Sequence, residues 1–243
     1  MKFSVITITR NSETYLSKTL TSVAQQTFLN YEHIIWDGGS VDQTLNIASS
    51  FSNITLYQGQ DEGISDAMNR SAALAKGEFL IYLHADDLLV HSQVLNMVDR
   101  ILTLHPTFHW LYGRANFIDF QGKIRHTTPY EPFTFKRLRR YNFITHPATF
   151  VRRSLFQKVG GFRKDLHYCM DYDLWLRIAA TGNFPLALST ILACFRQHPS
   201  SRSTHQPIQV ANEAYHVRNR YVNLFERYRS YLTWKKRRQK SIE

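Results

Sequence analysis

Short apolar runs alternate with amphipathic segments along the first hundred residues of the chain. The β-branched run at residues 3–8 predicts a buried strand, and residues 15–24 then repeat apolar side chains at helical spacing. The same alternation predicts further strands at 31–36, 54–57 and 79–83, with a helix in each interval. Strands and helices that alternate at this pace predict βαβ units and a parallel sheet.

The pattern changes after about residue 105. The later elements that we predict are strands at 110–120, 123–128 and 187–195, helices at 154–162 and 172–181, and a long helix from Pro207 onward. Gln121-Gly122 is the expected turn between the first two of these strands. We therefore expect an α/β protein with a parallel sheet in its first half, a mixed second half packed on that sheet, and a C-terminal helical arm.

Positive charge is concentrated in the C-terminal part of the chain. The 243 residues have a formal net charge of +11, and residues 196–243 alone contain eleven Lys or Arg against three acidic residues. Aromatic residues make up 14% and hydrophobic residues 43% of the chain, which excludes a disordered protein. We interpret residues 1–200 as a catalytic domain and residues 201–243 as a basic, amphipathic helical extension.

No apolar run reaches the length of about 18 residues that a membrane span needs. The apolar stretch at the N-terminus is shorter than the core of a signal peptide and has no small-residue cleavage site. Cys169 and Cys194 are too few for a disulfide framework or a zinc site, so we interpret both as core thiols. These features predict a cytoplasmic protein.

Polar and acidic side chains follow three of the predicted strands. Thr9 closes the first, Asp37 the second, and Asp86-Asp87 the fourth. Ligands of open α/β sheets bind beyond the carboxyl ends of the strands. Two adjacent carboxylates there repel each other unless a cation lies between them, and oxygen ligands favour Mg²⁺ or Mn²⁺. The alternative is that one of the two aspartates only caps the following helix.

Several motifs occur in a fixed order between residues 3 and 200. They are Thr9-Arg-Asn, Asp37-Gly-Gly-Ser-Val-Asp-Gln-Thr, Asp61-Glu-Gly-Ile-Ser-Asp-Ala-Met-Asn69, Gly77-Glu-Phe-Leu-Ile-Tyr-Leu-His-Ala-Asp-Asp87, His146-Pro-Ala-Thr-Phe, Val159-Gly-Gly-Phe and Met170-Asp-Tyr-Asp-Leu-Trp-Leu-Arg177. The ordered set resembles the family-2 glycosyltransferases of bacterial surface-polysaccharide synthesis. This resemblance implies the GT-A fold, a Rossmann-like sheet that binds a nucleotide-diphosphate sugar, with UDP as the expected nucleotide. It also implies a divalent metal, Mn²⁺ or Mg²⁺, and inversion at the anomeric carbon.

The resemblance also implies roles for single residues on the donor side. Asp37 corresponds to the aspartate that binds the nucleobase edge, and Thr9 lies in the loop that contacts the nucleoside. Asp61 and Asn69 belong to the segment that completes the nucleotide pocket.

The resemblance further implies a metal site and a catalytic base. Asp87, in an exposed loop, is the implied metal ligand, with Asp86 as a contact to the ribose or to a metal-bound water. The first aspartate of a literal D-x-D motif is replaced by Ala85. His198 matches a histidine that also reaches the metal in some relatives. Asp171 is the implied base. In the family a Glu usually precedes this aspartate, but here that position is Met170, so Asp173 stays open as an alternative base.

The expected partners are a nucleotide-sugar donor and a glycan or lipid-linked acceptor. We expect the end of the basic arm to contact an anionic membrane surface through Tyr228, Tyr231, Leu232 and Trp234, which would place the enzyme peripherally on the inner face of the cell membrane. Packing on the catalytic domain or a helix-pair dimer are alternatives, so the oligomeric state stays open.

Two other functions fit parts of the sequence. A nucleotidyltransferase would use a similar sheet and metal, but its Gly-rich basic loop is replaced by Thr9-Arg-Asn-Ser-Glu13. Nucleic-acid binding through the basic arm would leave the acidic residues at the strand ends without a role, so we expect no nucleic-acid partner.

Overall fold

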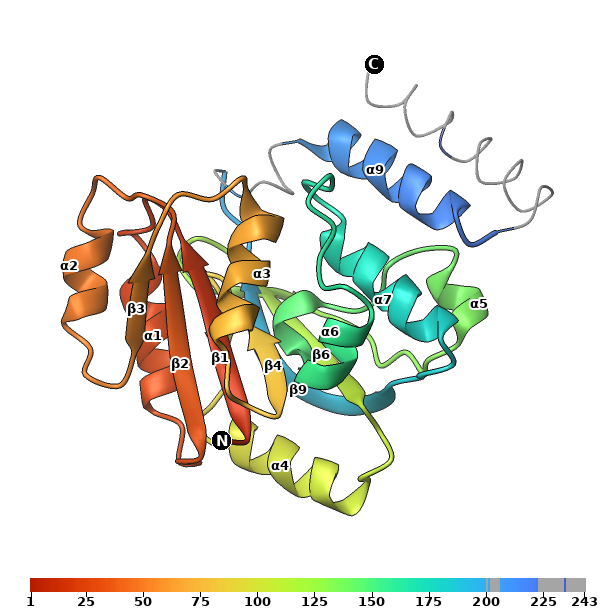
Figure 1. Cartoon of the computed structure of the whole chain (residues 1–243), viewed down its shortest axis with the longest axis horizontal. Helices are drawn as coiled ribbons and strands as arrows, with labels where there is room; N and C mark the ends of the chain where they lie inside the picture. Colours follow the sequence, from red (N-terminus) through yellow and green to blue (C-terminus); the bar gives the residue numbers. More distant parts are fainter. Residues whose placement is uncertain (200, 202–205, 223–233, 235–243) are drawn as a thin grey trace.

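A mixed β-sheet forms the centre of the protein. The computed structural model describes residues 1–199, 201, 206–222 and 234, and within them nine strands form one sheet in the order β3-β2-β1-β4-β8-β6-β9-β5, with β7 paired to β6 (Figure 1). The strands are β1 (Phe3–Thr9), β2 (Tyr31–Asp37), β3 (Thr55–Gln58), β4 (Phe79–Tyr82), β5 (Leu88–Leu89), β6 (Trp110–Ile118), β7 (Ile124–Thr127), β8 (Thr149–Arg152) and β9 (Leu186–Arg196).

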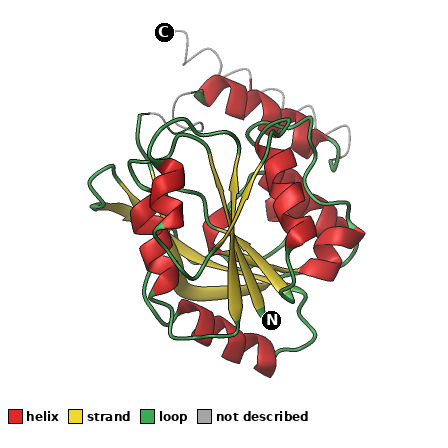
Figure 2. Cartoon of the chain, turned by 60° about the vertical axis from the view of Figure 1, so that its left-hand side comes forward, coloured by secondary structure: helices red, strands yellow, loops and turns green. Residues whose placement is uncertain are grey.

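Helices connect these strands and cover the sheet. They are α1 (Leu16–Ala24), α2 (Thr44–Ser49), α3 (Ile64–Leu74), α4 (Val94–Leu104), α5 (Phe135–Leu138), the 3-10 helix η1 (His146–Ala148), α6 (Arg153–Lys158), α7 (Met170–Ala180) and α9 (Pro207–Asn219). Figure 2 shows helices on both sides of the sheet. Within the described part of the chain, no helix is both long enough and apolar enough to cross a bilayer.

The first half of the sheet is parallel, as the sequence predicts. Strand β1 pairs in parallel with β2 on one side and β4 on the other, and β2 pairs in parallel with β3. Side chains of β1 alternate between two core clusters, since Ile6 packs with the α3 side and Val5 with the α4 side. Strands β1 and β4 are buried on both faces, which explains their mostly apolar sequences, whereas β3 at the edge of the sheet is partly exposed.

The second half is mixed, which confirms the second part of the fold prediction. Strand β8 lies antiparallel between β4 and β6, and β9 runs parallel to β6 but antiparallel to β5. The predicted hairpin is present, and Gly122 at its turn has φ +93°, a conformation that favours glycine. The sequence analysis did not predict β5, β8, α4 or α5.

Helix α9 begins at Pro207, as predicted, and lies along α7 (Figure 1). Its Val217 is fully buried in the same core cluster as α7, and Ala214 and Tyr221 pack against that cluster. The apolar stripe of the arm therefore packs on the rest of the protein at least as far as Tyr221. Leu224, Tyr228, Tyr231 and Leu232 lie outside the described residues, whereas Trp234, expected at the membrane, is half-buried and donates from its Nε1 to Asn212 Oδ1 of α9 at 2.7 Å.

Candidate active site

The carboxyl ends of β1 and β2 bring two of the expected residues together. Thr9 and Asp37 are direct partners in the parallel pairing of these strands. The backbone N–H of Gly38 continues the ladder by donating to the Thr9 carbonyl oxygen at 3.0 Å. Because both strands end here, the following loops begin at the same edge of the sheet, where ligands of α/β sheets bind.

The Asp37 carboxylate organises the loop that follows β2. Its Oδ1 accepts hydrogen bonds from the backbone N–H groups of Gly39, at 3.0 Å, and Ser40, at 2.8 Å. The Ser40 hydroxyl donates to Oδ2 at 2.5 Å. Gly39 has φ +89°, so the turn needs a residue that tolerates the left-handed region. The side chain expected to bind a nucleobase is buried and also fixes the shape of its own loop.

Asp61 lies directly against this loop. Its Oδ1 accepts a hydrogen bond from the backbone N–H of Gly63 at 3.0 Å, and its Oδ2 accepts one from the indole Nε1 of Trp36 at 3.2 Å. A Cβ atom at Gly38 would lie 2.7 Å from Asp61 Oδ2, so a larger residue at this position would force the Asp61 carboxylate to move. The Arg10 side chain also lies near Gly38, with its Cδ 3.8 Å from where a Cβ atom of residue 38 would be. Two segments that the sequence assigned to one nucleotide pocket are therefore adjacent.

Asn69, expected in the nucleotide pocket, is hydrogen-bonded to the protein backbone instead. Its Nδ2 donates to the carbonyl oxygen of Phe162, and its Oδ1 accepts from the backbone N–H of the same residue, both at 2.8 Å. A Cβ atom at Gly161 would lie 2.5 Å from Asn69 Oδ1. Both ends of the amide are thus engaged by the loop after α6. Asn69 joins α3 to that loop, and its direct contact with a nucleotide is not supported.

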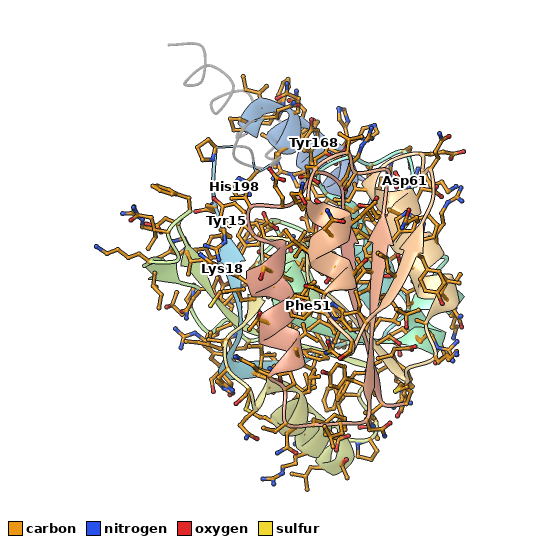
Figure 3. The ribbon with its side chains drawn as sticks, turned by 90° about the vertical axis from the view of Figure 1, so that its left-hand side faces the viewer. Tyr15, Lys18, Phe51, Asp61, Tyr168 and His198 are labelled. Carbon is orange, nitrogen blue, oxygen red and sulfur yellow. The ribbon has the colours of Figure 1, made fainter. Side chains whose placement is uncertain are left out.

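Asp86 and His198 meet at the end of β4 although 112 positions separate them. His198 Nε2 lies 3.0 Å from Asp86 Oδ2, and both side chains keep part of their surface exposed, 15% for the histidine and 29% for the aspartate. The His198 ring packs beside that of Tyr15, with centroids 5.0 Å apart. Figure 3 shows Tyr15 and His198 side by side and Asp61 further along the same end of the molecule.

The neighbouring Asp87 is buried, not exposed as the sequence analysis expected. Its Oδ1 accepts a hydrogen bond from the backbone N–H of Arg196 at 3.0 Å, and only 1% of the residue is exposed. Oδ2 has no hydrogen-bond partner among the described residues. Burial, and the nearby charge of Asp86, raise the pKa of the Asp87 carboxyl well above its usual range. Asp87 thus joins the turn after β4 to the end of β9, and Asp86 is the more accessible acid.

Arg196 connects three parts of this region, and the sequence analysis did not single it out. Its guanidinium donates to the carbonyl oxygens of Asp86 and Asp119, each at 3.0 Å, and lies 4.7 Å from the centroid of the Tyr15 ring. Only 1% of Arg196 is exposed. A basic residue at the end of an apolar strand, two positions before His198, was the available signal. Its hydrogen bonds fix the Asp86 loop against the hairpin of β6 and β7.

Asp171 lies in the first turn of α7, whose N-cap residue is Cys169. Its Oδ1 accepts a hydrogen bond from the backbone N–H of Tyr172 at 2.6 Å, and its Oδ2 accepts one from Asn142 Nδ2 at 3.3 Å. Burial raises the pKa of this half-buried carboxyl to about 6. Such a group is mostly ionised at neutral pH and can still accept a proton efficiently.

Asp173, the alternative base, is held in a buried group of ion pairs. Its carboxylate is fully buried and forms ion pairs with Arg177, at 2.6 Å, and with Arg220, at 3.3 Å. Arg177 in turn donates to the carbonyl oxygens of Val159 and Gly161, both at 2.6 Å. Both oxygens of the Asp173 carboxylate are thus engaged in ion pairs that hold α7 against its surroundings. Of the two acids, Asp171 is partly exposed and Asp173 is fully buried.

Comparison with known proteins assigns the family. The profile described as glycosyl transferase family 2 matches residues 4–160. The chain belongs to glycosyl transferase family 2. A Mycobacterium bovis protein named PGL/p-HBAD biosynthesis glycosyltransferase is 33% identical over 180 residues, which cover 72% of this chain and 68% of that relative. An uncharacterised glycosyltransferase of Mycobacterium tuberculosis is 30% identical over 197 residues, covering 79% of this chain and 74% of the relative. The protein is therefore a glycosyltransferase.

Solved structures confirm the fold of this family-2 glycosyltransferase as GT-A. The structure of residues 1–349 of S. aureus TarS in complex with UDP-GlcNAc matches with a TM-score of 0.69, 19% identity and coverage of 89% of this chain. The mannosyltransferase PcManGT of Pyrobaculum calidifontis, in complex with GDP-Man and Mn²⁺, matches with a TM-score of 0.64, 19% identity and coverage of 91%. This chain spans 65% of the length of each.

Proposed function

We propose that this glycosyltransferase moves a sugar, with inversion, from a nucleotide-diphosphate donor, in our interpretation UDP-linked, to a glycan or lipid-linked acceptor in cell-surface polysaccharide synthesis. The observation that carries the proposal is the pairing of Asp86 with His198 at the same sheet edge as Asp37 and Asp61. The names of the similar proteins support it, since TarS was solved with UDP-GlcNAc and PcManGT with GDP-Man.

The donor nucleotide would bind over the ends of β1 and β2. Thr9 and Asp37 are adjacent there, and the Asp61 carboxylate closes the side of the same loop. Thr9 is buried, and its hydroxyl has no hydrogen-bond partner among the described residues, so it has hydrogen-bonding capacity for a nucleoside. Asn69 would act indirectly, by fixing the loop that contains Gly161 and Phe162.

A divalent cation would be held by Asp86 and His198. The described residues contain no group of three or more His, Cys, Asp or Glu side chains placed to hold an ion. Mg²⁺ and Mn²⁺ sites of phosphate-transferring enzymes commonly combine one or two protein ligands with phosphate oxygens, so the pair fits such an ion. When bound, the cation would neutralise the negative charge that develops on the departing diphosphate. Asp87, the ligand implied by the resemblance, would support this site through Arg196.

Asp171 would act as the general base. In the ionised form it would take the proton of the attacking acceptor hydroxyl, and inversion requires only this one carboxylate. Asn142 and the Tyr172 backbone N–H orient its two oxygens through the hydrogen bonds described above. A carboxyl with a pKa of about 6 would be available as a base at neutral pH.

The acceptor side of the proposal rests on the C-terminal part of the chain. Residues 223–243, apart from Trp234, lie outside the described structure, and they contain most of the basic residues of the arm. Aromatic and basic side chains together favour the interface of an anionic membrane. We propose that this segment brings the enzyme to a lipid-linked acceptor at the inner face of the cell membrane.

The decisive experiment is a panel of UDP- and GDP-linked sugars, incubated with the protein and Mn²⁺ and scored for release of the free nucleotide. Slow hydrolysis of one donor is expected, because water can replace the missing acceptor. Release of pyrophosphate from nucleoside triphosphates, with every nucleotide sugar left intact, would favour a nucleotidyltransferase instead.

A further inference from the structure

The carboxylate of Glu213, in the C-terminal helix α9, binds the backbone directly in front of α7. Its Oε1 accepts a hydrogen bond from the N–H of His167 at 2.8 Å. Its Oε2 accepts hydrogen bonds from the N–H groups of Tyr168 and Cys169, both at 2.6 Å. One side chain thus satisfies three consecutive backbone donors from a position more than forty residues later in the chain.

These three donors belong to the N-cap residue of α7 and to the two residues before it, so Glu213 fixes the segment that leads into the helix. The first N–H groups of a helix have no partner within the helix, and a side chain usually supplies one. The N-cap residue Cys169 forms no side-chain cap, and Glu213 instead binds the N–H of Cys169 itself and those of the two residues before it. Hydrogen bonds to a carboxylate are about twice as strong as neutral ones, and a negative charge at a helix N-terminus is favourable.

Other contacts of α9 hold the same loop. The Cys169 thiol lies 3.6 Å from the Val210 carbonyl oxygen, and the Tyr168 hydroxyl forms a short hydrogen bond with the Gln206 side chain. Val217, two turns of helix from Val210, is fully buried against the α7 core cluster. The N-cap residue and the first two turns of α9 therefore contact the loop at residues 167–169. Tyr168 lies at the same end of the molecule as Asp61 and His198 (Figure 3).

We propose that Glu213 is a positioning residue for the reaction. By holding residues 167–169 it fixes where α7 begins, and so sets the direction in which Asp171, two residues after Cys169, presents its carboxylate to the acceptor. The C-terminal arm is then a working part of the catalytic unit, as far as α9, and not an appendage to a domain that ends near residue 200. This inference rests on the proposed role of Asp171 as the base.

The pKa of Asp171 supplies a measurement that distinguishes a positioning role of Glu213 from a role in stability alone. The negative charge of Glu213 contributes to the raised pKa of Asp171. The other titratable neighbours of Asp171 are the Cys169 thiol and the Tyr172 phenol, whose pKa values are raised by burial, so both stay uncharged near neutral pH. The positive charge of Arg218 in α9 opposes the rise in the pKa of Tyr172. Glu213 is therefore the charged neighbour whose removal shifts the titration of Asp171 to lower pH.

The test compares Glu213→Ala and Glu213→Gln with Gln209→Ala, a control at an exposed position of the same helix. With the donor identified by the nucleotide-sugar panel, we expect Glu213→Ala to lower kcat by about 10- to 100-fold with little change in the donor KM, because a displaced base slows only the chemical step. The acidic limb of its kcat profile should move to lower pH. Glu213→Gln keeps the shape without the charge, so it should show the same shift of the limb with a smaller loss of kcat. Gln209→Ala should match the wild type.

Hydrogen exchange gives a second readout that does not depend on activity. The amides of residues 167–169 should exchange slowly in the wild type and in Gln209→Ala, and at least tenfold faster in Glu213→Ala. If Glu213→Ala does not fold, Glu213→Gln provides a weaker comparison: its amide oxygen can still accept, but its amide nitrogen cannot, so at least one of the amides of residues 167–169 should exchange faster than in the wild type.

The outcomes separate the two proposals. A wild type that transfers sugar, together with Glu213 variants that keep its kcat and its acidic limb, overturns the inference and leaves the function intact. A wild type that uses no nucleotide sugar overturns the proposed function. In that case unchanged exchange of residues 167–169 in Glu213→Ala also overturns the anchoring role of Glu213, and faster exchange supports it.

Discussion

The side-chain amide of Asn142 donates a hydrogen bond to Oδ2 of Asp171, 3.3 Å away, from the loop that follows α5. The two residues come from segments that lie on different sides of β8 in the chain, and the contact forms only because α7 packs against α5. One oxygen of the candidate base is thus held by tertiary packing, and only the other is held locally, by the backbone N–H of Tyr172.

Replacement of the candidate base should separate chemistry from binding. Asp171→Asn keeps the shape of the side chain but cannot take up a proton, so we expect kcat to fall by roughly 10²- to 10⁴-fold with the donor Kd nearly unchanged. Steady-state kinetics and a nucleotide-binding titration measure the two quantities. The matched variant Asp173→Asn should instead lower the melting temperature, because it breaks buried ion pairs with Arg177 and Arg220. A larger loss of turnover in Asp173→Asn at unchanged stability would contradict the assignment.

The titration of Asp171 should also appear in the pH dependence of activity and of stability. Its pKa of about 6 predicts an acidic limb of kcat near that pH. The folded-state pKa is raised above the ordinary value of 3.8, so the folded state binds more protons between these two values, and stability falls as pH rises through them. Asp171→Asn lacks this group and should lose less stability than the wild type over the same range. Chemical denaturation at about pH 4 and about pH 7 tests the sign.

The two adjacent aspartates after β4 should behave differently. Asp86→Ala and His198→Ala should each raise the Mn²⁺ concentration needed for half-maximal donor hydrolysis by at least about tenfold, with little loss of stability, since both side chains are partly exposed. Asp87→Ala should lower the stability, because it removes a buried acceptor of the Arg196 backbone N–H. Full activity of the wild type in excess EDTA would remove the metal from the proposal.

Asn69→Ala should destabilise the fold by about 1–3 kcal/mol, because it leaves both backbone groups of Phe162 without their partners. The loss should appear as a lower midpoint in urea at unchanged slope. Asn46→Ala, in the exposed part of α2, is the control and should stay within about 0.5 kcal/mol of the wild type. Equal midpoints for the two variants would show that the Phe162 loop does not depend on this amide.

Membrane contact through the end of the arm can be tested by sedimentation with liposomes. The full chain should bind vesicles that contain anionic lipid, and added salt should weaken the binding by screening. Truncation after Phe225 should abolish it while preserving α9, which ends at Asn219. If the truncated protein sediments as well as the full chain, the segment has another role.

The sequence predicted the first half of the sheet because each buried parallel strand is a separate apolar run. Strand β8 was missed because its four residues lead directly into α6 and show no alternation, and β5 is only two residues long. The motifs assigned the metal to Asp87 and expected this residue in an exposed loop. That expectation failed because the burial of Asp87 depends on the Arg196 backbone, 109 positions later. The sequence pattern also did not indicate a role for Glu213, because its three partners lie in the loop before α7, more than forty residues earlier.

The position of β9 has a consequence for how the protein is made. This strand lies between β6 and β5, and its end supplies Arg196 and leads to His198. A chain leaving the ribosome can therefore pair strands β1 to β4 early. The Asp86 loop can reach its partners Arg196 and His198 only after more than a hundred further residues have been synthesised. Contacts of such long sequence separation form late and slowly. The parallel strands β1 to β4 are expected to pair early in synthesis, and the Asp86–His198 pair only after residue 198 has been added.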